Sequence, residues 1–168
     1  MEVKIKNLDE TKLLAECFAD NIKEKGAFVS LFGDIGAGKT AFTRFLLKNL
    51  GVIEDVTSPS FVILNEYKTK FFPIYHFDLY RLENEGVKSI KDELLAYSED
   101  KVLTLVEWAN FGEGELPIDR IEINIKYDLE NYSQERIFEM NAKGEYFENV
   151  VLKTVEEFNK KRNKNWNF

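Results

Sequence analysis

The stretch LFGDIGAGKT, residues 31–40, constrains the fold of this chain more than any other segment. Its Gly33, Gly38, Lys39 and Thr40 fit the spacing G-x-x-x-x-G-K-[ST], the pattern of a phosphate-binding loop, or P-loop. Glycines let the backbone turn so that successive N–H groups point at phosphate oxygens. The lysine would reach the β- and γ-phosphates, the threonine hydroxyl would bind Mg²⁺, and the next helix would point its positive end at the anion. The alternative is an ordinary glycine-rich turn before a helix.

The segments on either side of this loop favour the phosphate-binding interpretation. AFVSLF at 27–32 is a short, mostly apolar run typical of a buried strand, and a helix is expected from the loop to about residue 49. A strand, a P-loop and a helix in this order belong in an α/β sheet. We therefore expect one domain over residues 1–168, an α/β fold of the P-loop NTPase type. It would be a three-layer sandwich whose mainly parallel central sheet has antiparallel edge strands.

Hydrophobic periodicity predicts the other elements. Asn7 and Glu10 are spaced like a capping box, and Gly26 is expected to end the helix that follows. Two alternating segments late in the chain predict an antiparallel pair of strands at the sheet edge. The expected ranges are a strand at 2–6, a helix to about 25, a loop at 54–61, a hairpin within 61–82 that breaks near 68–70, a helix at 86–98, a strand at 102–107, a loop at 108–117, strands at 120–127 and 136–140, and a helix at about 145–163.

Composition narrows the classes of function. A net charge of −7 and a pI of about 4.9 argue against direct nucleic-acid binding as the main function, because phosphate contacts need a basic surface. The single cysteine, Cys17, and the single histidine, His76, exclude zinc fingers and His-rich zinc sites but leave magnesium with oxygen ligands open. The sequence has no apolar signal core and no apolar run near 18 residues, which predicts a cytoplasmic protein that does not span a membrane.

Two acidic residues are candidates for the carboxylate that a P-loop ATPase needs beside its magnesium ion. Glu107 closes the apolar run VLTLVE, where the carboxyl ends of buried strands meet a ligand, and is favoured for the metal role. Asp78 alternates with His76 and Tyr80, so the three are expected to share one strand face. That face is either a half-exposed polar surface or a catalytic shell in which Asp78 positions water or metal. His76 is expected to be a hydrogen-bonded structural residue.

Two further features lie near these acids in the sequence. The segment TSPS at 57–60 carries hydroxyls where a γ-phosphate sensor lies in GTPases, although from the residues alone a plain Ser-Pro turn is the favoured interpretation. Trp108 follows Glu107 directly, and either packs in the core or shapes the nucleotide site.

The motifs GDIGAGKT, VTSPSF, YHFDLYRL and LVEW occur in the order and approximate spacing of the TsaE (YjeE) family. The chain resembles this family over roughly residues 8–125, with Ser60 where the family usually has Thr and Ala109 where it often has Pro. The resemblance implies that Glu107 lies on the magnesium side and that Asp78 is important for hydrolysis. It also implies that residues 58–60 form a switch-like loop and that the stretch ending at Thr11 approaches the nucleotide base.

The motifs and the resemblance together define the predicted site. Catalytic roles are expected for Lys39, Asp78 and Glu107, and magnesium ligands from Thr40 and Glu107. The predicted nucleotide contacts are Thr11, Gly33, Gly36, Ala37, Gly38, Lys39, Thr40, Ala41, Ser58, Trp108 and Asn110.

Proteins of the TsaE family are ATPases needed for N6-threonylcarbamoyladenosine at adenosine 37 of tRNA. The resemblance therefore implies an accessory protein that uses ATP and Mg²⁺, acts on the TsaD–TsaB complex and meets tRNA only indirectly. The main alternative is a P-loop small-molecule kinase, but the chain's arginines do not cluster as the lid of such a kinase requires. A regulatory GTPase is disfavoured because the base-reading N-K-x-D signature is absent. A non-catalytic binding module is the third alternative.

Overall fold

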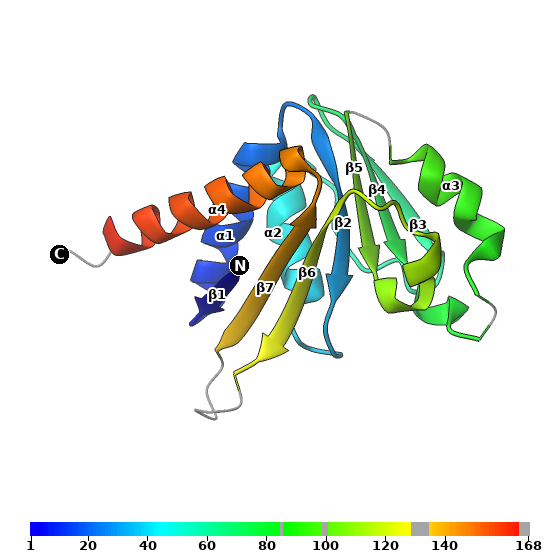
Figure 1. Ribbon diagram of the computed structural model, residues 1–168, viewed down its shortest axis with the longest axis horizontal. Helices are drawn as coiled ribbons and strands as arrows, with labels where there is room; N and C mark the ends of the chain where they lie inside the picture. The colour runs from blue at the N-terminus through cyan, green and yellow to red at the C-terminus, as the bar shows by residue number, and fades with distance from the viewer. Residues whose placement is uncertain (85, 99–100, 129–134, 165–168) are drawn as a thin grey trace.

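Seven strands form one sheet in the computed structural model of the chain, which describes residues 1–84, 86–98, 101–128 and 135–164 (Figure 1). The strands are β1 (Glu2–Ile5), β2 (Gly26–Phe32), β3 (Leu64–Lys68), β4 (Pro73–Asp78), β5 (Val102–Glu107), β6 (Arg120–Tyr127) and β7 (Arg136–Lys143). The α-helices are α1 (Leu8–Ile22), α2 (Lys39–Asn49), α3 (Lys91–Ala96) and α4 (Glu145–Lys164), and the short 3-10 helices are η1 (Tyr80–Leu82), η2 (Lys88–Ile90) and η3 (Ala109–Glu115).

The sheet order, β1-β7-β6-β2-β5-β4-β3, places the P-loop strand β2 in the middle. The four central strands β6, β2, β5 and β4 run parallel, while β3, β7 and β1 pair antiparallel on the two sides. This confirms the predicted α/β class, with a parallel centre and antiparallel edges. One detail differs from the prediction. Of the late pair of strands, β6 lies inside the sheet beside β2, and the outermost position belongs to β1.

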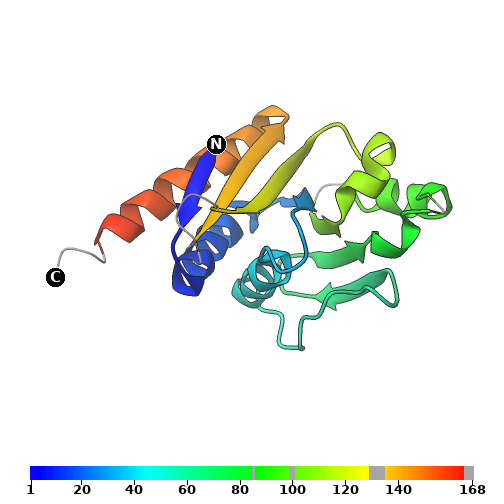
Figure 2. The same ribbon diagram turned by 90° about the horizontal axis from the view of Figure 1, so that it is seen from below.

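Two hydrophobic clusters cover the two faces of the sheet. Along β2, Val29 and Leu31 belong to one cluster and Phe28 and Phe32 to the other, and alternate residues of a strand point to opposite faces. The first cluster joins the sheet to α1, α2 and α4, and the second joins it to α3 and the 3-10 helices. The result is the predicted three-layer arrangement. β1 and α4 lie at one end of the molecule and α3 at the other (Figures 1 and 2).

Helix α1 begins as the capping-box spacing predicts. The Asn7 side chain accepts a hydrogen bond from the Glu10 N–H at 3.0 Å, and the Glu10 carboxylate accepts one from the Lys6 N–H at 2.8 Å. The end of the helix was predicted wrongly, because α1 stops at Ile22 and Gly26 is the first residue of β2. Gly26 has a φ of +81°, and a Cβ atom there would lie 1.9 Å from the Val102 carbonyl oxygen. The glycine is thus required by the close approach of β2 to β5.

We expect the substitution Gly26→Ala to destabilise the protein strongly. A positive φ costs a non-glycine residue about 1–3 kcal/mol, and the clash with a backbone carbonyl adds to that cost. The matched control is Gly114→Ala, since no atom lies within 4 Å of a Cβ built at Gly114. Urea unfolding should show a clear loss of stability for the first variant and little change for the second. Equal midpoints for the two variants would contradict this account of Gly26.

Two other expected elements are shorter than predicted. The helix expected at 86–98 is replaced by η2 and the six-residue α3, of which only Leu94 is buried. The second hairpin strand ends at Asp78, because the Asp78 carboxylate accepts a hydrogen bond from the Tyr80 N–H at 2.9 Å and turns the chain into η1. Tyr80 therefore lies outside the strand face that it was expected to share with His76 and Asp78. The loop expected at 108–117 contains η3.

The helix expected at about 145–163 is confirmed as α4. In the described ranges, no helix is both long enough and apolar enough to cross a bilayer.

Candidate nucleotide site

The P-loop connects the carboxyl end of β2 to the first turn of α2, and its glycines adopt conformations that other residues avoid. Gly33, Gly36 and Gly38 have φ values of +136°, +80° and +119°. A Cβ at Gly33 would also lie 2.4 Å from the Ile125 carbonyl oxygen. Gly38 is the residue before α2, so the backbone reverses just where the helix presents its free N–H groups. The loop has the geometry that an anion site at a helix N-terminus requires.

Lys39 is a buried cation at the start of α2. Its side chain is 6% exposed, and its Nζ donates to the carbonyl oxygens of Gly33 at 2.5 Å and Asp34 at 3.1 Å. Burial lowers the pKa of Lys39, and the nearby carboxylates, of which Glu107 has the largest effect, oppose that shift. Nζ also lies 4.5 Å from the centre of the Trp108 ring. A buried ammonium held mainly by carbonyl dipoles is well placed to receive the charge of a phosphate.

A cavity of about 260 Å³ opens in front of this lysine. The sheet, the P-loop, the start of α2 and the segment before β3 all contribute to its wall. Of the predicted site residues it is lined by Gly36, Gly38, Lys39, Thr40, Ala41, Ser58, Asp78, Glu107 and Trp108. The structure therefore brings together most of the predicted phosphate and magnesium residues in one place, and adds Ser60 to them.

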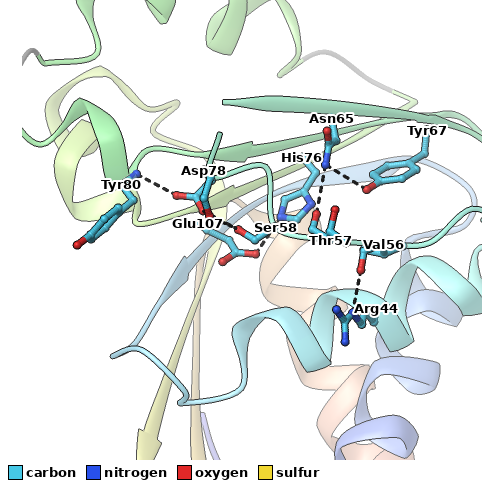
Figure 3. A network of polar contacts seen from close by, with 11 residues as sticks. Arg44, Val56, Thr57, Ser58, Asn65, Tyr67, His76, Asp78, Tyr80 and Glu107 are labelled. Carbon is cyan, nitrogen blue, oxygen red and sulfur yellow. Dashed lines mark hydrogen bonds and ion pairs between the residues drawn. The ribbon is translucent and has the colours of Figure 1, made fainter. Parts of the chain in front are cut away.

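Strand register places the two acids side by side. Asp78 is the last residue of β4 and Glu107 the last residue of β5, and they are direct partners in the parallel pairing of these strands. Both lie on the sheet face that carries Leu103 and Leu105, which is the face covered by α1 and α2. Their side chains are almost fully buried, with each residue 2% exposed. Two neighbouring strand ends thus present carboxylates to the same cavity (Figure 3).

Each carboxylate has its own hydrogen-bond donors. Asp78 Oδ2 accepts hydrogen bonds from the Ser58 hydroxyl at 2.6 Å and from the Ser60 hydroxyl at 2.8 Å. Glu107 Oε1 lies 2.9 Å from His76 Nε2, on the same face of the sheet (Figure 3). The expectation that His76 is a hydrogen-bonded residue is confirmed. The segment at 57–60 is joined to the site through Asp78, which the sequence alone did not indicate.

A second cavity of about 260 Å³ lies beside the P-loop, toward α1 and β7. Among the predicted nucleotide contacts it is lined by Thr11, Gly36, Ala37, Gly38 and Ala41. It shares three of these with the first cavity, so one extended ligand can reach both. Sequence reasoning missed Arg136, which lines this cavity and donates from Nε to the Ala37 carbonyl oxygen at 3.1 Å. No local motif marks Arg136, because it arrives from the start of β7 through the sheet topology.

Asn110 and Gly33 do not line either of these two cavities, although the Gly33 carbonyl oxygen accepts a hydrogen bond from Lys39. They line a separate cavity of about 540 Å³ between the P-loop, η3 and the end of β6, to which Trp108 also contributes. The structure therefore does not bring Asn110 together with Thr11. The indole of Trp108 packs within 5.1 Å of the Tyr80 ring and 5.8 Å of the Phe111 ring, measured between centroids. Trp108 thus packs against other aromatic rings and also contacts Lys39 at the first cavity. Its role in shaping a nucleotide site stays a prediction.

Known proteins resemble this chain along most of its length. Residues 5–137 match the family model described as Threonylcarbamoyl adenosine biosynthesis protein TsaE. The tRNA threonylcarbamoyladenosine biosynthesis protein TsaE of Bacillus subtilis (strain 168) is 42% identical over 120 residues, which cover 71% of this chain and 73% of that protein. The protein of the same name from Haemophilus influenzae is 36% identical over 143 residues, covering 83% and 85%.

A solved structure agrees with these sequence matches. The crystal structure of Bacillus subtilis YdiB superimposes with a TM-score of 0.74 at 32% sequence identity. The match covers 93% of this chain and 94% of that one.

Proposed function

Because the chain belongs to the TsaE family, we propose that it serves tRNA threonylcarbamoyladenosine biosynthesis as a magnesium-dependent ATPase acting on the TsaD–TsaB complex. The observation that carries the proposal is the meeting of Lys39, Asp78 and Glu107 at one cavity beside the P-loop. A lysine, a helix N-terminus and two carboxylates are the parts that phosphoryl transfer to water requires.

The phosphates of ATP would lie in the cavity in front of Lys39. The backbone N–H groups of the loop and of the first turn of α2 would bind their oxygens, and Lys39 would exchange the carbonyls of Gly33 and Asp34 for the β- and γ-phosphates. The rest of the nucleotide would extend past Gly36 and Ala41 into the second cavity, toward Thr11 and Arg136.

The donors at the phosphate cavity also fit magnesium. A threonine hydroxyl and a carboxylate are hard oxygen ligands, and Mg²⁺ usually takes only one or two of them from the protein beside a substrate phosphate. Thr40 and Glu107 would supply these two. When bound, the ion neutralises charge that develops on the phosphates. Asp78 would orient the attacking water, with its carboxylate held by Ser58 and Ser60.

Rapid hydrolysis at this site would depend on a partner protein. Arg81, the arginine closest in sequence to Asp78, has its guanidinium 4.7 Å from the centre of the Phe61 ring. We expect slow hydrolysis by the protein alone, because none of the described residues that line the phosphate cavity is an arginine able to stabilise the transition-state charge. Hydrolysis of this kind is useful if the energy changes the conformation of the TsaD–TsaB complex.

Steady-state ATP hydrolysis tests the proposal, measured for the protein alone and with a purified TsaD–TsaB pair from the same source. We expect a slow rate alone, a changed rate with the pair, and a complex that can be isolated. Hydrolysis that ignores the pair, with no complex formed, would contradict the proposed role. A screen of small phosphate acceptors would then test the alternative of a small-molecule kinase.

A further inference from the structure

The contact between His76 and Glu107 lies on the sheet face that is covered by α1 and α2, and Glu107 also lines the phosphate cavity. His76 is in the interior of β4 and is 0% exposed, and Glu107 at the end of β5 is 2% exposed. His76 is paired across the strands with Leu105, so its ring reaches diagonally along the sheet to meet Glu107. The two atoms in contact, Nε2 and Oε1, are 2.9 Å apart.

The second ring nitrogen fixes the direction of this hydrogen bond. His76 Nδ1 is buried and has no hydrogen-bond partner among the residues that the structure describes. A proton on Nδ1 would be a buried donor without an acceptor, which costs more than an unpaired lone pair. The proton therefore belongs on Nε2, and His76 donates it to Glu107. One carboxylate oxygen is thereby held, and the other is left for a ligand in the cavity that Glu107 lines.

Fold stability alone does not explain this pair. A buried polar pair in a sheet is often replaced by apolar side chains of similar volume without loss of stability. Within the described part of the chain, His76 also has a buried nitrogen without a hydrogen-bond partner, which an apolar ring would not have. The hydrogen bond ends on Glu107, one of the two acids that line the phosphate cavity. The other acid, Asp78, takes its donors from Ser58 and Ser60, in the segment before β3.

We propose that His76 is a positioning residue for Glu107: its Nε2–H orients the carboxylate toward the magnesium site at the end of β5. The inference rests on the proposed ATPase function. A hydrogen-bond donor that orients a metal-binding carboxylate has a larger effect when the metal ion requires precise ligand geometry. Loss of such a donor typically costs about 10–100-fold in metal affinity or activity. Mg²⁺ is demanding in this respect, because it accepts only near-octahedral geometry.

The test compares two substitutions in the full-length protein. His76→Phe keeps a planar ring of similar size but removes the donor, and His76→Gln keeps an N–H at nearly the same distance along the side chain. We expect the phenylalanine variant to need about 10–100-fold more Mg²⁺ for half-maximal hydrolysis. Its affinity for a non-hydrolysable ATP analogue, measured by calorimetry, should fall in Mg²⁺ and stay unchanged in EDTA. The glutamine variant should recover most of both losses.

A matched control separates positioning from packing. Thr104→Val removes a different buried hydrogen bond, from the Thr104 hydroxyl to the Tyr97 carbonyl oxygen, on the opposite face of β5. This variant should keep the magnesium requirement of the wild type, and thermal melts should show both phenylalanine and valine variants folded. Adding His76→Phe to Glu107→Gln should cause no further loss, because the donor then has no carboxylate to orient.

Three outcomes would overturn the inference. The first is a His76→Phe variant with the magnesium requirement of the wild type, the second a Thr104→Val variant that shifts as far, and the third a folded His76→Gln variant as impaired as His76→Phe. A wild-type protein whose binding and turnover both ignore Mg²⁺ would instead contradict the proposed function itself. The two failures are therefore distinguishable.

Discussion

Replacing Lys39 with alanine should reduce ATP turnover by about 100-fold or more, the effect of removing one preorganised group that stabilises transition-state charge. The ammonium lies at the phosphate cavity, where, among the described residues, it contacts the carbonyls of Gly33 and Asp34 and the face of Trp108. These partners are the ones that a phosphate would displace. Nucleotide affinity should fall as well, because the same charge binds the ground state.

The fold should survive this substitution. Burial penalises the charge of Lys39 and lowers its pKa, so alanine removes an unfavourable desolvation as well as a hydrogen-bond donor. Lys48→Ala is the matched control, because Lys48 is exposed near the other end of the same helix. Hydrolysis and calorimetric titration with ATP should separate the two variants. A Lys39→Ala protein that hydrolyses ATP at the normal rate would refute the phosphate role of the loop.

The substitution Glu107→Gln should reduce magnesium-dependent hydrolysis by about 100-fold while changing nucleotide binding in EDTA very little. Glutamine keeps the size of the side chain and one carbonyl oxygen but removes the charge that would face the ion. Glu107 belongs to the sheet and not to the P-loop, and its buried side chain reaches the cavity from the end of β5. The substitution should therefore affect the magnesium ion without changing the phosphate-binding loop.

Glu66→Gln provides the matching control, because Glu66 is an exposed residue of β3. Both variants should be measured over a range of Mg²⁺ concentrations. If Glu107→Gln left hydrolysis unchanged, the metal role would move to Asp78, the direct neighbour of Glu107 across the two strands.

The central fold was predictable because its signals are local. The P-loop pattern, the apolar runs of β2 and β5 and the capping box of α1 each depend on a few adjacent residues. The end of α1 was not predictable in the same way. Gly26 looks like a helix stop, but the carbonyl of Val102, which lies far away in the sequence, requires the glycine. The prediction of one long helix at 86–98 was wrong for a related reason: only one residue of the short α3 that forms there is buried.

The residues of the candidate site likewise divide into those that local motifs predicted and those that the topology brings in. Lys39, Thr40, Asp78 and Glu107 lie within motifs, and the structure places all four at one cavity. Arg136 reaches the neighbouring cavity only because β7 lies between β1 and β6, and no short sequence pattern expresses that arrangement. The hydrogen bonds from Ser58 and Ser60 to Asp78 likewise depend on how a loop folds back over the sheet.

The pairing of β1 with β7 sets an order for folding during synthesis. Residues 2–5 pair with residues 136–139, so β1 is synthesised long before the strand with which it pairs. At about 5–20 residues per second it waits on the order of ten seconds, while the parallel centre can already assemble. Such distant contacts also slow refolding. Until residues 136–139 have been synthesised, β1 lacks the strand with which it pairs, and an unpaired strand edge favours aggregation.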